Sequence, residues 1–223
     1  MLTAAHVVGS LSAAHSLEQY EVLHGTNPDC PQAGDPRIGE VIESHPPQPC
    51  EEITLDACLV QIDDHVTLGR KVRGRVVSGR ARDLTGVDDY VTVFKRGINA
   101  PKLTKGLLDP TFESLKVEMP QGKGKTLVRH YLRGWFVHGD GRPFARPGDS
   151  GSIVVDEDDC VVAMVVALLA KDPQAPEAQD LAFVIPICDV LTELKVRLTG
   201  PDRPCTLAGG ARRFYGARHP GAA

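Results

Sequence analysis

The sequence lacks an apolar run long enough to cross a membrane as a helix, which takes about 18 residues. Its longest run, from Cys160 to Ala170, is rich in β-branched residues and has the length of a strand or two. The first residues also lack the basic region and apolar core of a signal peptide. We therefore expect no membrane contact and predict a cytoplasmic or other intracellular protein.

An excess of basic charge is also lacking, because 25 Lys and Arg stand against 29 Asp and Glu, for a formal net charge of −4. Dedicated nucleic-acid binders carry a basic surface, so we exclude nucleic acid as a partner. The six cysteines include no CxxC motif. Cys58, Cys160 and Cys188 lie in apolar, strand-like runs, which predicts buried free thiols and fits an intracellular setting.

No recognisable metal or cofactor motif is present. The histidines and cysteines of the loop-rich N-terminal region do not have the ligand spacing of a known zinc site. They are His15, His24, His45, Cys30 and Cys50. The "GKGK" at 122–125 lacks the spacing of a phosphate-binding loop, and the "DEDD" at 156–159 is predicted to be a solvated hairpin turn rather than a calcium site. We predict neither metal nor cofactor.

Turn residues and short apolar runs are abundant, with 22 glycines and 17 prolines among 223 residues. This balance is typical of many short strands, and the length suits one large all-β domain or two small packed units. Apolar alternation or β-branched runs predict strands at several places. The segments are 52–63, 75–80, 89–97, 102–108, 125–139, 151–169 and the first part of 181–198.

Three other segments have different patterns. Residues 21–52 hold six prolines and are predicted to be mostly loop. The end of 181–198 has helical spacing of its apolar side chains, at Val190, Leu191, Leu194 and Leu198, which predicts a C-terminal helix. Residues 201–223 have no periodicity and are predicted to be a disordered tail. We expect one unit at 1–75 and a second at 76–200.

The stretch "RPGDSGSIVVD" places Ser150 between Asp149 and Gly151. Gly-Asp-Ser-Gly is ordinary turn chemistry, so the tetrapeptide alone leaves Ser150 either a turn residue or a nucleophile. A serine nucleophile needs an adjacent base that is itself oriented by a third group. His6 in "LTAAHVV" is a candidate base. Asp56 in "LDACLV" is an acid in an apolar strand, and it requires a hydrogen-bond donor if it is buried.

"TAAHV", "LDACLV" and "GDSGS", in the order His, Asp, Ser, resemble the three signature segments of trypsin/chymotrypsin-like serine peptidases. The resemblance covers roughly residues 3–198. It implies two six-stranded antiparallel β-barrels of chymotrypsin type and a C-terminal helix. The first barrel would be incomplete, since only five residues precede the histidine, and we expect an N-terminally truncated product or an inactive relative.

The same resemblance implies a role for each site residue. Ser150 would be the nucleophile, His6 the general base and then acid, and Asp56 the group that orients the imidazole. The backbone N–H groups of Gly148 and Ser150 would form the oxyanion hole. In relatives activated by cleavage, the acid before the serine pairs with a new N-terminal amine; Asp149 is expected to have another partner or solvent.

The resemblance also implies a specificity pocket with Phe144 near its base and Met164, Val165 and Val166 along a wall. Phe144 lacks the negative charge that would bind a Lys or Arg side chain of the substrate. We therefore expect cleavage after small or apolar side chains. Two functions stand as hypotheses. One is a serine endopeptidase acting on polypeptides through an acyl-enzyme. The other is a non-catalytic protease-like module that binds peptides or proteins, or an inactive truncated fragment.

Overall fold

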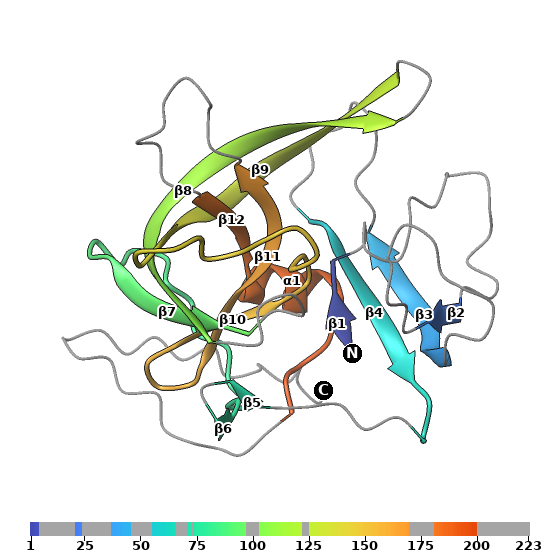
Figure 1. Cartoon of the computed structure of the whole chain (residues 1–223). Helices are drawn as coiled ribbons and strands as arrows, with labels where there is room; N and C mark the ends of the chain where they lie inside the picture. The colour runs from blue at the N-terminus through green and yellow to red at the C-terminus, as the bar shows by residue number, and fades with distance from the viewer. Residues whose placement is uncertain are drawn as a thin grey trace, which may run out of the picture.

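The computed structural model describes residues 1–4, 21–23, 37–45, 55–65, 71–72, 74–96, 103–121, 125–169 and 181–199. These residues form twelve β-strands and one short helix, which confirms the all-β class. Six strands close into a barrel, four form an open sheet, and two form a small hairpin. Figure 1 shows the barrel on one side of the molecule and the open sheet on the other.

The closed barrel has the strand order β10-β11-β12-β9-β8-β7, and every pairing in it is antiparallel. Closure gives each strand two neighbours and leaves no sheet edge. The predicted hairpin of residues 151–169 is confirmed, with Val154 opposite Ala163. The barrel strands are β7 (Val91–Lys95), β8 (Thr104–Gln121), β9 (Lys125–Gly139), β10 (Ile153–Asp156), β11 (Val161–Leu169) and β12 (Leu181–Pro186).

The helix α1 (Ile187–Glu193) follows β12 directly and confirms the predicted C-terminal helix. Its buried residues Ile187 and Val190 lie in the same apolar cluster as Leu194, which follows the helix. None of the helices in the described part of the chain is long and apolar enough to span a membrane. The predicted tail, 201–223, lies outside the described residues.

The open sheet has the strand order β1-β4-β3-β2. Its strands are β1 (Leu2–Thr3), β2 (Glu21–Leu23), β3 (Arg37–His45) and β4 (Ala57–Ile62). The described residues thus show one closed barrel and this sheet, where the sequence predicted two barrels. The prediction that 21–52 is mostly loop is wrong at β2 and β3. Prolines flank β3 at Pro36 and Pro46 but do not interrupt it, and it gains its hydrogen bonds from β4.

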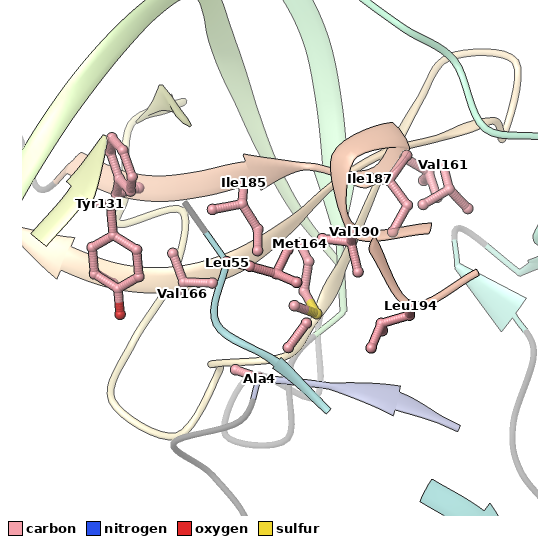
Figure 2. Packing of buried hydrophobic residues seen from close by; sticks show 14 of the residues in the cluster. Ala4, Leu55, Tyr131, Val161, Met164, Val166, Ile185, Ile187, Val190 and Leu194 are labelled. Carbon is pink, nitrogen blue, oxygen red and sulfur yellow. The ribbon is translucent and has the colours of Figure 1, made fainter. Parts of the chain in front are cut away.

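Three apolar clusters form the core, and the smallest, of Val41, Cys58 and Val60, lies within the open sheet. Of the other two, one fills the barrel and includes Trp135, Phe144 and Val184. The other joins the barrel to the open sheet, because it contains Leu55 as well as Met164. Figure 2 shows the second cluster, in which Ala4 and Leu55 share the space with side chains of β11 and β12. The barrel and the open sheet therefore share this part of the core.

The hairpin of β5 (Lys71–Val72) and β6 (Arg75–Val76) precedes a segment that lies against the β10–β11 turn. Arg82 pairs with Asp156 at 2.8 Å and with Asp158 at 2.7 Å. Asp156 and Asp159 are buried, so the prediction of a solvated turn is wrong for these two residues. Their burial is possible because arginines and backbone N–H groups bind the carboxylates.

The cysteines differ in part from the prediction. Cys58 and Cys188 are free thiols, as expected, and burial raises the pKa of each to about 11. Cys160 is instead disulfide-bonded, so the predicted free thiol is wrong there. Disulfides persist mainly in oxidising compartments, and the thiol argument for an intracellular setting does not extend to Cys160.

Candidate active site

Asp56 is completely buried directly before β4, between the buried residues Leu55 and Ala57. The hydroxyl of Tyr131, in β9, donates a hydrogen bond of 2.8 Å to its Oδ2 atom. A buried carboxylate needs such donors, because its desolvation is otherwise costly. The sequence predicted this need, but Tyr131 was not among the candidates, since a contact between positions 75 residues apart leaves no local signal.

The loop that carries Ser150 is shaped by two glycines with left-handed backbone, Gly148 at φ +91° and Gly151 at φ +84°. Backbone N–H groups on either side of Ser150 are used within the protein. Asp149 donates to the Arg146 carbonyl at 3.0 Å and Gly151 to the Val165 carbonyl at 2.8 Å. Among the described residues, the N–H groups of Gly148 and Ser150 donate no such bond. Within the described part of the chain, bonded and unbonded N–H groups thus alternate along this loop.

Asp149 forms a buried ion pair with Lys95, the last residue of β7, with 2.6 Å between Nζ and Oδ2. Both side chains are at most 1% exposed. The same Oδ2 also accepts the backbone N–H of Arg146 at 2.9 Å. Burial lowers the pKa of the Lys95 ammonium, although its hydrogen bond to Asp149 opposes that shift. Asp149 therefore has a cationic partner inside the barrel, and no local signal in the sequence indicates Lys95, because it lies 54 residues away.

The serine loop contacts the first strand of the open sheet. A Cβ atom on Gly151 would lie 2.3 Å from Oγ1 of Thr3 and 2.8 Å from the backbone nitrogen of Ala4. Thr3 is in turn paired with Cys58 in β4. The residues just before His6, the strand that follows Asp56 and the residue after Ser150 therefore meet in one place. His6 itself lies outside the described residues.

The predicted specificity residues are all buried, at 2% exposure or less. Phe144 and Val165 belong to the cluster inside the barrel. Met164 and Val166 belong to the cluster between barrel and sheet. The structure thus divides these four residues between two sides of the barrel wall and does not gather them around one space.

Among the described residues, no three His, Cys, Asp or Glu side chains gather in a way that could hold a metal ion. Of the residues considered for zinc, His45 is described, and its ring lies 3.1 Å from Oε1 of Glu43. The others, His15, His24, Cys30 and Cys50, lie outside the described residues, as does most of the "GKGK" segment.

Comparison with known proteins shows similarity of fold. No family model matches this sequence, and no curated protein matches it either. One similar solved structure is the chymotrypsin of Cellulomonas bogoriensis. It is 16% identical over 74% of this chain and 76% of that one, with a TM-score of 0.50. Another is described as a glutamic acid specific serine protease that utilizes a novel histidine triad in substrate binding. It is 13% identical over 89% of this chain and 85% of that one, with a TM-score of 0.53. The described residues therefore have a fold similar to that of chymotrypsin-like serine proteases.

Proposed function

We propose that this protein is a serine endopeptidase in which Ser150, His6 and Asp56 form the catalytic triad. Ser150 Oγ attacks the peptide carbonyl while His6 accepts its proton, and His6 then returns that proton to the leaving amine. Water, activated by the same histidine, hydrolyses the acyl-enzyme and restores the Ser150 hydroxyl. Asp56 holds the imidazole in the required tautomer. The substrate is a polypeptide.

The close approach of Gly151 to Thr3 and Ala4 carries this proposal. Ala4 precedes His6 by two positions, and consecutive Cα atoms are about 3.8 Å apart, so the His6 Cα is within about 8 Å of the Ala4 Cα. Ser150 precedes Gly151 directly. In the chain, the proposed base and the proposed nucleophile therefore each lie within two residues of this contact. The pairing of Thr3 with Cys58 brings the Asp56 segment alongside.

The backbone around Ser150 supports the oxyanion hole proposed at Gly148 and Ser150. Their N–H groups donate no hydrogen bond to other described residues, whereas those of Asp149 and Gly151 do. Donors already oriented in the ground state stabilise a developing oxyanion without reorganisation. The buried ion pair between Asp149 and Lys95 connects this loop to β7 of the barrel. The proposal extends to two units, 1–75 and 76–200, with the active site between them.

We also propose that the enzyme cleaves after small or apolar side chains. This rests on the resemblance, which implies Phe144 near the base of the pocket, where it offers no negative charge to a basic side chain. Peptide substrates that differ only in the residue before the cleaved bond would test this. Faster turnover after Ala, Val or Leu is expected, and faster turnover after Lys or Arg would contradict it.

Labelling with a fluorophosphonate probe tests the proposed function, because such probes react with activated serines. The folded wild type should be labelled, and Ser150→Ala should lose at least 99% of the label, given the large contribution of a triad serine, about 10⁴-fold or more. Ser152→Ala is the matched control, since it removes a second hydroxyl from the same loop, and it should label like the wild type.

Two outcomes would contradict the proposal. One is a folded wild type that does not react with the probe, which would favour the non-catalytic peptide-binding alternative. The other is labelling that survives in Ser150→Ala, which would place the reactive group elsewhere. Circular dichroism of each variant shows that the comparison is made between folded proteins.

A further inference from the structure

Tyr131 is the residue that carries this inference, because it brings the barrel into contact with a buried carboxylate of the open sheet. Its hydroxyl donates to Oδ2 of Asp56 at 2.8 Å. Tyr131 is 1% exposed and Asp56 is not exposed at all. A hydrogen bond to an ionised acceptor in such surroundings is stronger than one between neutral groups. Asp56 thus receives a charge-assisted bond from the other half of the molecule.

The shape of the β8–β9 hairpin explains how Tyr131 reaches Asp56. The pairing of these strands shifts between Asp109 and Glu113 and again between Glu113 and Leu115. Such irregularities bend a strand pair and increase its twist. Tyr131 lies opposite Leu115, just beyond the second shift. Figure 1 shows the hairpin leaving the barrel and running towards the side of the molecule where β4 lies.

Aromatic packing holds the ring of Tyr131. The ring of Phe183 lies 5.8 Å from it between centroids, and Phe183 in turn contacts Phe136 at 5.1 Å. Gly134 makes room for Phe183, because a Cβ atom there would lie 2.3 Å from its Cζ. Figure 2 shows Tyr131 in the cluster near Val166 and Leu55, the residue before Asp56. Packing thus sets the position of the hydroxyl independently of its bond to Asp56.

We propose that Tyr131 is a positioning residue for the triad, because its hydroxyl orients the Asp56 carboxylate towards the imidazole of His6. A carboxylate has several acceptor sites on its two oxygens, so a bond from Tyr131 at Oδ2 restrains its rotation and is compatible with a further bond from the ring N–H. Tyr131 does not touch the substrate or the reacting atoms and acts through Asp56. This inference rests on the proposed function of Asp56.

The test is Tyr131→Phe, which keeps the ring and its packing and removes only the hydroxyl. We expect kcat on a peptide substrate to fall about 10- to 100-fold, the range for loss of a hydrogen bond to a charged group. KM should stay within about twofold, because the substrate is not contacted. Tyr90→Phe is the matched control. It removes another tyrosine hydroxyl, from a side chain that is 60% exposed, and should leave kcat unchanged.

A double-mutant cycle separates positioning from a general structural role. If Tyr131 acts through Asp56, Tyr131→Phe should change kcat by less than about twofold when Asp56→Asn is already present. A fall in kcat of the same factor in both backgrounds would contradict the inference. So would a rise in KM with unchanged kcat.

The failures of the inference and of the proposed function differ. If the wild type is labelled and Tyr131→Phe behaves like Tyr90→Phe, the positioning role is wrong and the peptidase proposal stands. If the folded wild type does not react with the probe, the peptidase proposal fails, and the catalytic role of Tyr131 fails with it. In that case, the free energies of unfolding of Tyr131→Phe, Asp56→Asn and the double variant can still be compared. If the two single effects are not additive, the hydrogen bond contributes to stability alone.

Discussion

The closed barrel and the open sheet each contribute a buried aspartate to the candidate site, and the two carboxylates are held in different ways. In the barrel, Asp149 pairs with the ammonium of Lys95, from a strand of the same barrel. In the open sheet, Asp56 accepts a hydroxyl bond from Tyr131, which belongs to the barrel.

The difference shows which half depends on the other. The partner of Asp149 comes from a barrel strand, and the closed part of the barrel has no sheet edge. The open sheet reaches the site through β1, which consists of Leu2 and Thr3, and through the start of β4. Both places contact the barrel, at Gly151 and at Tyr131. We infer that the sheet side of the site is ordered by the barrel, and the following predictions test this asymmetry.

The largest effect is expected for Lys95→Met, which keeps an apolar stem and removes the charge. Removing one partner leaves the Asp149 carboxylate buried without its counter-ion, at a cost of about 3–5 kcal/mol in the free energy of unfolding. Denaturant unfolding measures this cost. Labelling of Ser150 should fall as well, because Asp149 directly precedes the nucleophile.

Two further variants make this prediction specific. Lys105→Ala removes a lysine from its ion pair with Asp140, in which both side chains are about half-exposed. The free energy of unfolding should fall by no more than about 1 kcal/mol. Adding Asp149→Asn to Lys95→Met should recover most of the lost stability, because the unpaired charge is gone. If Lys95→Met and Lys105→Ala lower the free energy of unfolding equally, the buried Lys95–Asp149 pair does not stabilise the barrel side of the site.

A smaller effect is expected for Gly151→Ala, which tests the contact between barrel and sheet. The new methyl group would meet Thr3 and Ala4, and the backbone is left-handed at φ +84°. Gly141→Ala is the matched control, since Gly141 has φ +70° with nothing within 4 Å of the added Cβ. Gly141→Ala should lower the free energy of unfolding by about 1–2 kcal/mol, because alanine is disfavoured in left-handed backbone. Gly151→Ala should cost about 1–3 kcal/mol more, with a loss of Ser150 labelling.

The unfolding free energies of the two alanine variants decide whether this contact matters. If they agree and both variants label like the wild type, the approach of Thr3 to the serine loop does not organise the site. That result would remove the observation on which the proposed triad rests.

The smallest effect concerns pH. Burial lowers the pKa of Lys95 below its usual value of 10.5, with Asp149 opposing the shift and Arg146 adding to it. Raising the pH through this lowered pKa removes the ammonium, so the labelling rate should fall before pH 10.5 is reached. Global stability should not fall with it, because a neutral amine, unlike the side chain in Lys95→Met, can still donate a hydrogen bond to Asp149. The unfolded chain also binds more protons than the folded one in this window, and that difference favours the folded state as the pH rises.

The labelling rate as a function of pH, in the wild type and in Lys95→Met, measures this effect. The alkaline fall should be absent from Lys95→Met, which has no ammonium at this position to lose. A wild-type rate that stays level up to pH 10.5 would contradict the role of the charged pair.

Much of the barrel could be predicted because its signals are local. The hairpin of β10 and β11 follows from two apolar arms around a turn, and the helix from the spacing of Val190 and Leu194. β3 was missed because the prolines around it predicted a loop, while its strand structure comes from pairing with β4. The burial of Asp156 was missed because Arg82, its partner, is distant in sequence.

The sequence by itself determined the chemistry offered to the site: a serine between glycines, an acid in an apolar run, and a histidine in a third segment. These depend on residue types and near neighbours, which a sequence displays directly. The tertiary structure alone decided that Lys95 holds Asp149, that Tyr131 holds Asp56 and that Gly151 lies against Thr3. Each of these contacts joins positions more than 50 residues apart. Only barrel closure and the packing of the sheet on the barrel bring them together, because burial obliges a charged group to pair with whatever donor the fold places beside it.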